Sequence, residues 1–421
     1  MFVRGMREYG DIVHFRMLVR HVYLVSAPEG VKHVLVDHTA KYSKGTGIQK
    51  LGALLLGDGL LTSEGELWKR QRRLAQPAFH RERLAKLAGV MTSATRDMLD
   101  RWEQRKARGE SFDAAVDFMA LTLSIVSRAL FSIDVAEDAA AVGKAMTVAL
   151  EETNRRILSF VPFPLWVPTA DNREYRAAVR VLDDVVFKII DARRKGQSTG
   201  TDLLQMLMEA RDEETGAGMD DRQLRDEVMT LFLAGHETTA NALAWTVWLV
   251  ARHPEVEARL RAEVEQVLGG RAPEVRDVSK LRYVSQVLDE AMRLYPPAWI
   301  TARECIEPDE LMGYHVPRGT IVAVCPFTTH HNPRLWPDPD RFDPDRFAPE
   351  RAQDRPRHAY FPFGAGQRMC IGNSFALMEM ALVLAMLYQR FSPRLEEGHP
   401  VEPHPRVTLR PLHGVRVRLG E

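Results

Sequence analysis

Cysteine is scarce in this sequence. The 421 residues include three cysteines, Cys305, Cys325 and Cys370. No two of them form the C-x-x-C spacing that is typical of zinc sites and dithiol redox centres. A small and odd number of cysteines fits a reducing compartment better than a secreted fold held together by disulfide bonds. We therefore expect a cytoplasmic protein whose cysteines are not paired in disulfides.

The chain also lacks a long apolar run and an excess of charge of either sign. No stretch reaches the roughly 18 consecutive apolar residues that suggest a membrane span, and residues 1–5 do not begin an apolar signal sequence. Lys+Arg and Asp+Glu both number 57, whereas nucleic-acid-binding proteins usually carry a basic excess that neutralises phosphates. We expect a chain with no membrane anchor and no nucleic-acid partner.

Periodicity predicts a mainly α fold with a small β part. Residues 12–15 and 21–25 are β-branched and aromatic runs bounded by turn residues, which indicates strands. The predicted helices with the strongest patterns are 221–252, 254–268, 283–295 and 371–391. The first of these is apolar on nearly every side and is therefore expected in the centre of a large domain. We expect a single domain over residues 1–421 and a monomer.

One cysteine lies in an unusual segment. Residues 361–372 read F-P-F-G-A-G-Q-R-M-C-I-G, an irregular glycine-rich loop that ends where the last helix is predicted to begin. The N-terminus of a helix favours a thiolate through its dipole and its unpaired backbone N–H groups. Glycines also remove side chains where a flat cofactor must approach the backbone. The plainer alternative is a structural cysteine in a turn.

Four residues of this loop, Phe363, Gly366, Arg368 and Cys370, fill the pattern F-x-x-G-x-R-x-C. The segment resembles the haem-binding loop of the cytochrome P-450 family. The resemblance implies the fold of that family, with haem b between the long central helix and the cysteine loop. It also implies that Cys370 ligates the haem iron, Arg368 pairs with a propionate, and Phe363 and Gly366 lie against the ring. A thiolate ligand favours cleavage of the O–O bond.

The long helix contains residues that suit a buried helix poorly. Residues 234–239 read A-G-H-E-T-T. Glycine costs about 1 kcal/mol against alanine in a helix, and threonine competes for backbone hydrogen bonds. A local break that makes room for a small ligand and water would explain the composition. A buried polar group that serves specificity or binds water is the alternative. The H-E-x-x-H zinc motif fails because position 240 is alanine.

The same segment resembles the oxygen-activation motif of the family, A-G-x-[D/E]-T. The resemblance implies that Thr238 donates a hydrogen bond to dioxygen and that Glu237 relays protons from solvent, while Ala234 and Gly235 lie against the cofactor. Two protons must reach the distal oxygen before the O–O bond breaks. A positioned acid is the usual way to deliver them.

Glu290 and Arg293 have the i, i+3 spacing of an acid–base pair on one helix face. A solvated pair of this kind contributes little to stability. The spacing resembles the E-x-x-R motif of the family, and residues 342–347 resemble its P-E-R-F segment, with Asp345 where glutamate is commoner. The resemblance implies that Glu290, Arg293 and Arg346 form a buried network that fixes the cysteine loop.

Further basic residues match positions that the family uses for the haem propionates. Trp68 and Arg72 fit a W-x-x-x-R pair, and Arg303 lies where another such arginine is often found. The alternative for each arginine is a role in surface solubility. The neighbouring cations of residues 69–73 could form a docking surface for an acidic electron donor, or simply a solvated helix face. These cations are Lys69, Arg70 and Arg73.

The resemblance implies an apolar substrate, namely a fatty acid, a terpenoid or another secondary metabolite. Apolar character marks residues 50–61 and 157–167 as candidate contacts, and such stripes are more often core than pocket. Individual candidates in the central helix and after the 283–295 helix are Leu231, Ala234, Ala298 and Ile300. Residues 293–299 resemble family members that act on long apolar chains.

The expected reaction is hydroxylation or epoxidation with dioxygen and two electrons. We expect a ferredoxin- or flavodoxin-type donor with its NAD(P)H reductase, because no such module is recognised within the chain. A peroxide-driven peroxygenase or hydroperoxide isomerase is the enzymatic alternative, and a haem-binding sensor or carrier is the non-enzymatic one. Glu237 and Thr238 argue against both. The first strand comes earlier than in most of the family, so we expect a shortened N-terminal region without the usual first helix.

Overall fold

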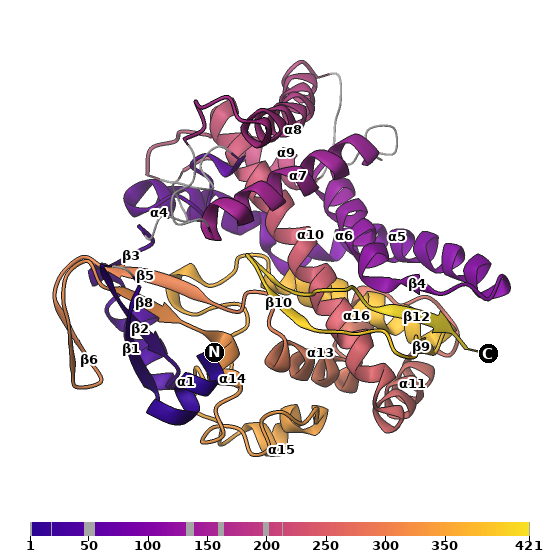
Figure 1. The fold of residues 1–421 in the computed structure, drawn as a ribbon. Helices are drawn as coiled ribbons and strands as arrows, with labels where there is room; N and C mark the ends of the chain where they lie inside the picture. The colour runs from indigo at the N-terminus through magenta and orange to yellow at the C-terminus, as the bar shows by residue number, and fades with distance from the viewer. Residues whose placement is uncertain are drawn as a thin grey trace. The chain divides into compact units, whose positions relative to one another are not determined.

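A computed structural model describes residues 2–17, 19–45, 55–131, 139–158, 164–196, 202–212 and 214–420 (Figure 1). The chain divides into two compact units. The first comprises residues 1–46, 91–121 and 237–421, and the second comprises residues 47–90 and 122–236. Three of the four points at which the chain passes from one unit to the other lie within helices, namely α5 (Arg81–Ala107), α6 (Ala114–Phe131) and α10 (Asp221–Ala251).

A five-stranded sheet lies in the first unit, in the order β1-β2-β8-β5-β3. β1 and β2 form an antiparallel hairpin that pairs Ile12 with Val25, and β2 runs parallel to β8, with Val22 opposite Ile321. Apolar side chains cover both faces, in keeping with the alternation of the strands. The bounds are β1 (Ile12–Met17), β2 (Arg20–Val25), β3 (Tyr42–Ser43), β5 (Thr301–Cys305) and β8 (Ile321–Val324).

A helix precedes this sheet, so the expectation of an opening without a first helix is wrong. α1 (Phe2–Tyr9) buries Met6. The ring of Phe2 stacks on Trp299, with centroids 6.1 Å apart. The pattern of the segment was too short to be recognised as a helix. Its apolar residues are nevertheless spaced so that they lie against the sheet.

Helices and three small sheets complete the first unit. The helices α11, α13 and α16 pack on one another. Their bounds are α11 (Pro254–Leu268), α13 (Arg282–Leu294) and α16 (Asn373–Arg390). The shorter helices are α2 (Pro28–Lys32), the π-helix η1 (His33–Asp37), α12 (Val275–Val278), α14 (Pro326–His330) and α15 (Pro349–Ala352), together with the 3-10 helices η2 (Thr39–Lys41), η4 (Pro344–Phe347) and η5 (Gly366–Arg368). The small sheets are β4 (Phe112–Asp113) with β12 (Arg416–Leu419) and β9 (Pro393–Leu395), β6 (Asp309–Leu311) with β7 (Tyr314–Val316), and β10 (Pro403–Pro405) with β11 (Leu409–Pro411).

The second unit is helical over its described residues. α7 (Ala139–Leu158) packs against α8 (Ala170–Arg194), and the side chain of Thr169 caps α8 by accepting a hydrogen bond from the Asn172 N–H. The other helices that begin and end in this unit are α4 (Gly65–Ala75) and α9 (Leu203–Glu209). In the part of the chain that the structure describes, no helix combines the length and apolarity that a membrane span requires.

The central helix is confirmed almost to the residue. Asp220 caps the start of α10 by accepting a hydrogen bond from the Gln223 N–H at 2.7 Å. The helix ends at Ala251, before His253 and Pro254. The mainly α fold with a small β part is likewise confirmed.

Candidate functional site

Cys370 differs from the other two cysteines in its surroundings. Cys305 and Cys325 are buried, and Cys370 is exposed. The thiol of Cys325 donates to the Trp299 carbonyl, and burial raises its pKa to about 11, so it stays protonated at neutral pH. Cys370 lies three residues before Asn373, the first residue of α16. Cys370 is therefore the one cysteine of this chain that is not buried.

The loop that carries Cys370 is held by backbone contacts. The Cys370 N–H donates to the Phe363 carbonyl at 2.9 Å, which closes the loop on itself. Gly366 has a φ of 67°, and a Cβ at this position would overlap the carbonyl oxygen of Leu35 in the π-helix η1. Glycine is therefore required at position 366 for two reasons, the left-handed backbone conformation and the close contact with η1. Phe363 and Arg368 are half-buried in the same loop.

The middle of α10 carries an open stripe on an otherwise buried helix. Ala234 is exposed, while Leu231, Gly235 and Thr238 are half-buried. These residues have the spacing i, i+3, i+4 and i+7, so they lie on one helix face. His236, on another face, is buried, and desolvation lowers its pKa to about 4, so it is neutral. The polar segment of the sequence thus includes a face that a cofactor or substrate can reach.

The expected local break in α10 is not present, because the helix is continuous through residues 234–239. A Cβ on Gly235 would lie 3.1 Å from the Val126 side chain of α6. The Thr122 hydroxyl of α6 donates to the His236 carbonyl at 2.9 Å. Close packing of α6 against α10 therefore accounts for the glycine, without any interruption of the helix.

Glu237 is buried and hydrogen-bonded. Its Oε1 accepts a hydrogen bond from the Thr408 hydroxyl at 2.7 Å. Burial raises the pKa of the Glu237 carboxyl, whereas Thr408 and the positive charge of Arg410 lower it. A raised pKa makes the carboxyl easier to protonate near neutral pH. Glu237 is thus a buried acid that can hold a proton, one residue before Thr238 in the chain.

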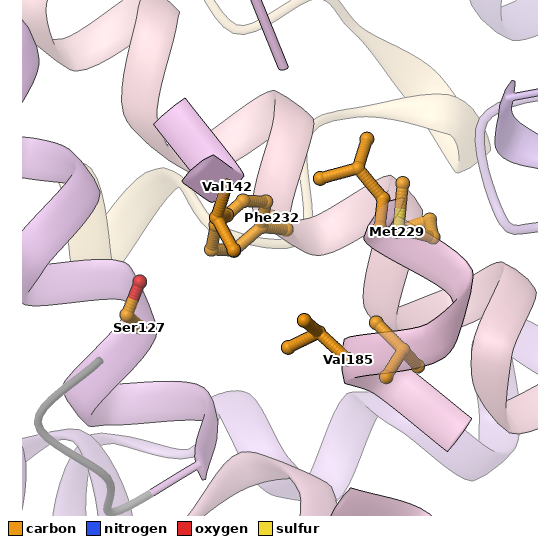
Figure 2. Close-up of a pocket in the computed structure, with 7 residues that line it drawn as sticks. Ser127, Val142, Val185, Met229 and Phe232 are labelled. Carbon is orange, nitrogen blue, oxygen red and sulfur yellow. The ribbon is translucent and has the colours of Figure 1, made fainter. Parts of the chain in front are cut away.

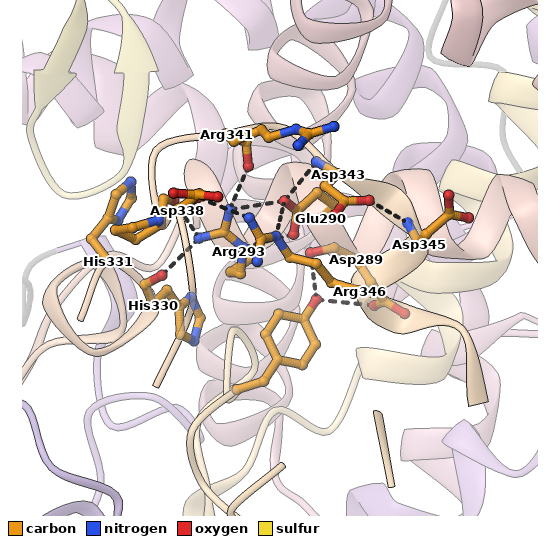
Figure 3. A network of polar contacts seen from close by, with 12 residues as sticks. Asp289, Glu290, Arg293, His330, His331, Asp338, Arg341, Asp343, Asp345 and Arg346 are labelled. Atoms are coloured by element: carbon orange, nitrogen blue, oxygen red, sulfur yellow. Dashed lines mark hydrogen bonds and ion pairs between the residues drawn. The ribbon is translucent and has the colours of Figure 1, made fainter. Parts of the chain in front are cut away.

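The three residues of the expected ion network lie together (Figure 3). Glu290 accepts hydrogen bonds from Arg293 at 2.6 and 2.8 Å and from Arg346 Nε at 3.2 Å. Glu290 and Arg293 are fully buried. Asp345 lies outside this network and forms an ion pair with Arg259 at 2.8 Å.

One histidine joins this network to the cysteine segment. Arg293 donates to the His330 carbonyl at 2.8 Å, and the His330 Nε2 accepts the Phe361 N–H at 3.1 Å. Phe361 is the first residue of the 361–372 segment. The pKa of His330 lies well below its ordinary value, because the ring is fully buried, so the ring stays neutral and can accept. No local sequence pattern marks His330, because 31 residues separate it from Phe361.

The remaining predicted site residues lie on regular elements. Trp68 is buried on α4, and Arg72, one turn later, is half-buried with its Nε bonded to Gln76 at 2.9 Å. Arg303 is buried on β5 and donates to the Thr301 hydroxyl at 3.0 Å.

Two of the three cations of the predicted docking surface, Lys69 and Arg73, form ion pairs with neighbouring acids. Arg73 forms ion pairs at 3.0 and 3.1 Å with two acids that follow α9 in the chain. Paired cations attract an acidic partner less than free ones do. The partners are Glu66 for Lys69, the Gly218 carbonyl for Arg70, and Asp212 and Glu214 for Arg73.

Among the substrate candidates, Ala298 is exposed and Ile300 is half-buried. Residues 46–54 and 159–163 lie outside the described residues, and with them most of the two apolar stretches. A cavity in the second unit has apolar walls and a volume of about 20 Å³, room for one water molecule (Figure 2). It is too small for an organic substrate. Its walls are Ser127, Val142, Leu182, Val185, Val186, Met229 and Phe232.

The described residues fit a haem on two counts. The exposed Cys370 precedes the N-terminus of α16, where a helix dipole favours an anionic group. An exposed face interrupts the burial of α10 at Ala234. These features provide a soft anionic ligand and an open helix face.

Comparison with known proteins agrees with a haem site in this chain. The family model described as cytochrome P450 matches residues 1–415. The chain is 40% identical to cyclooctatin synthase of Streptomyces melanosporofaciens, over 97% of this chain and 88% of that protein. It is 37% identical to cyclooctat-9-en-7-ol 5-monooxygenase of the same species, over 94% and 85%. Pentalenene oxygenase of Streptomyces avermitilis is 33% identical, over 99% and 92%.

A solved structure shares the fold. The crystal structure of the cytochrome P450DA heme domain superimposes with a TM-score of 0.92 and 28% sequence identity, over 100% of this chain and 92% of that one. The match extends over both compact units. On the family model, the relatives and the fold, this chain belongs to the cytochrome P-450 family.

Proposed function

We propose that this cytochrome P-450 oxidises a cyclic terpenoid and that Cys370 is the ligand of its haem iron. Membership of the family makes the chain a monooxygenase, an oxidoreductase with haem b as cofactor and dioxygen as co-substrate. The observation that carries the ligand assignment is the exposure of Cys370 before α16, while both other cysteines are buried. We further propose that residues 1–421 act as one P-450 domain.

The haem, when bound, supplies the centre at which dioxygen is reduced and one oxygen atom enters the substrate. Cys370 would hold it from the loop before α16, with Phe363 and Gly366 against the ring. We propose Arg368, Trp68, Arg72 and Arg303 as partners of the two propionates. An arginine suits this role, because its charge is permanent and its planar fork matches a carboxylate.

Protons must reach the oxygen that leaves as water. We propose that the Glu237 carboxyl holds a proton at its Oε atoms and passes it toward the open stripe of α10. The Thr238 hydroxyl would position the oxygen atom that accepts this proton. Burial supports this role, because it raises the pKa of Glu237 and so keeps a larger fraction protonated near neutral pH. Glu237→Gln would remove the relay while retaining the volume.

The relatives support a terpenoid substrate. The 5-monooxygenase is named for cyclooctat-9-en-7-ol, and the 33% identical relative is named for pentalenene. Leu231, Ala234, Ala298 and Ile300 offer apolar surface that suits such a ring system. Fatty acids and other secondary metabolites are the alternatives. We propose a ferredoxin- or flavodoxin-type donor with its NAD(P)H reductase as the source of the two electrons.

Two spectral measurements test the proposal. Titration of the haem-loaded protein with cyclic terpenes, and with fatty acids of similar carbon number, should give a spin-state change with the terpenes at lower concentration. A response to fatty acids alone would reject the terpenoid. The carbon monoxide complex of the reduced protein should show the far-red-shifted Soret band of sulfur ligation. Cys370→Ser should lose it, and Cys325→Ser, the matched control, should keep it.

A further inference from the structure

A hydroxyl from the C-terminal hairpin reaches the acid of the proposed proton relay. The hairpin consists of β10 and β11, and Thr408 lies in the turn between them. The Thr408 hydroxyl donates to Glu237 Oε1 at 2.7 Å, across 171 residues of sequence. Both side chains are buried. Neither the sequence motif of α10 nor the pattern of the hairpin indicates this contact.

A second residue of α10 sets the direction of that hydrogen bond. The Asn241 amide donates to the Thr408 oxygen at 3.1 Å. A hydroxyl has a single hydrogen, and the oxygen that accepts from Asn241 is left with that hydrogen for one other partner. The order Asn241 to Thr408 to Glu237 therefore directs the threonine hydrogen at the carboxylate.

The turn is fastened to the same face of α10 by a second contact. Trp245, eight residues after Glu237, donates its indole N–H to the Leu409 carbonyl at 3.0 Å. The Leu409 N–H in turn donates to the Pro297 carbonyl at 2.9 Å. Residues 237, 241 and 245 are spaced by one turn each, so one stripe of α10 meets the hairpin. The backbone beside Thr408 is thus fixed independently of its hydroxyl.

From this geometry we propose that Thr408 is a positioning residue of the monooxygenase reaction, which holds the Glu237 carboxyl on the hairpin side and favours its release of a proton. The inference rests on the proposed relay role of Glu237. Without the hydroxyl, the carboxylate form would lose a hydrogen bond in a buried site, so Glu237 would retain its proton to higher pH. The charged group that acts on Glu237 from the hairpin is Arg410, and His236 beside it is neutral.

Thr408→Val removes the hydroxyl at nearly constant volume. The infrared band of the protonated Glu237 carboxyl, identified by its loss in Glu237→Gln, should disappear on titration about one pH unit higher in the haem-loaded Thr408→Val variant than in wild type. The alkaline limb of product formed per reductant consumed should move the same way, because this limb requires the protonated acid. Thr408→Ser keeps a hydroxyl and should restore both to wild-type values.

Thr246→Val is the matched control. Thr246 is a fully buried threonine of α10 whose hydroxyl donates to the Ala242 carbonyl, so its loss leaves Glu237 untouched. An unchanged carboxyl titration in Thr408→Val, or a Thr408→Ser variant that shifts as far as valine, overturns the inference. If Thr408→Val fails to bind haem, Asn241→Leu tests the same chain of bonds and should move the titration in the same direction.

The relay and the positioning role fail in different ways. If Glu237→Gln keeps the wild-type product yield and pH profile, the relay role of Glu237 is wrong, and the infrared titration still reports on Thr408. If Glu237→Gln abolishes the alkaline limb and Thr408→Val leaves it in place, the relay stands and Thr408 has no part in it.

Discussion

Replacing Glu290 with alanine would leave two guanidinium groups in the core without their carboxylate. Glu290 accepts four hydrogen bonds, three from Arg293 and Arg346 and one from the Asp343 N–H at 2.9 Å. Removing one partner of a buried ion pair costs about 3–5 kcal/mol, because the remaining charge stays buried. A domain of ordinary stability has about 5–15 kcal/mol in total. Glu290→Ala should therefore unfold at far lower urea concentration.

Haem loading should fall along with stability. The network reaches the first residue of the cysteine segment through His330, so a displaced Arg293 removes the support of that contact. Asp345→Ala is the control, because its pair with Arg259 is half-exposed and a pair of that kind is worth about 0–1 kcal/mol. Urea unfolding measures the stability of each variant, and the haem content of the purified protein measures its haem loading. A Glu290→Ala variant within 1 kcal/mol of Asp345→Ala would refute the reasoning.

Three further outcomes follow from single contacts. Gly366→Ala should yield protein with little haem, seen in the Soret absorbance, because the new methyl group would overlap the Leu35 carbonyl. Gly89→Ala, in open space on α5, should load haem normally. Burial raises the pKa of Glu227 from 4.5 to about 8, so its contribution to stability is full below pH 4.5 and is lost as pH rises through 8. Urea unfolding of Glu227→Gln should show a smaller loss of stability between pH 5 and 8 than wild type, and an equal loss would contradict the assignment.

Local patterns predicted the parts of the fold that local physics determines. The first residue of α10 was predicted correctly because Asp220 caps that end, and its last residue was predicted to within one residue because Pro254 prevents continuation. The break predicted at residues 234–239 was wrong, since its premise was that glycine and threonine in a helix must interrupt it. The glycine instead allows Val126 of α6 to approach. The sequence of α10 alone does not show which other helix packs against it.

The candidate site was predictable where it is encoded in short motifs and not where it depends on distant contacts. Cys370 and Glu237 each lie in a segment whose residue types are unusual for their surroundings. His330 and Thr408 carry no such signal, because each acts on a residue far away in the chain. These two residues are identified by their hydrogen bonds in the structure. The same limit applies to Arg73, whose ion-pair partners are acids 139 and 141 residues away in the chain.

Two glutamates of α10 are buried with a raised pKa, and their surroundings distinguish them. Glu227 accepts the Leu60 N–H at 3.1 Å, and its other oxygen has no partner among the described residues. Glu237 adjoins the open stripe at Thr238 and is held by a directed hydroxyl. A relay must alternate between two partners, so an acid beside an open face suits it better than one covered by a backbone turn. Glu227→Gln should therefore retain the wild-type product yield per reductant, while Glu237→Gln should divert electrons to peroxide. The reverse result would assign the relay to Glu227.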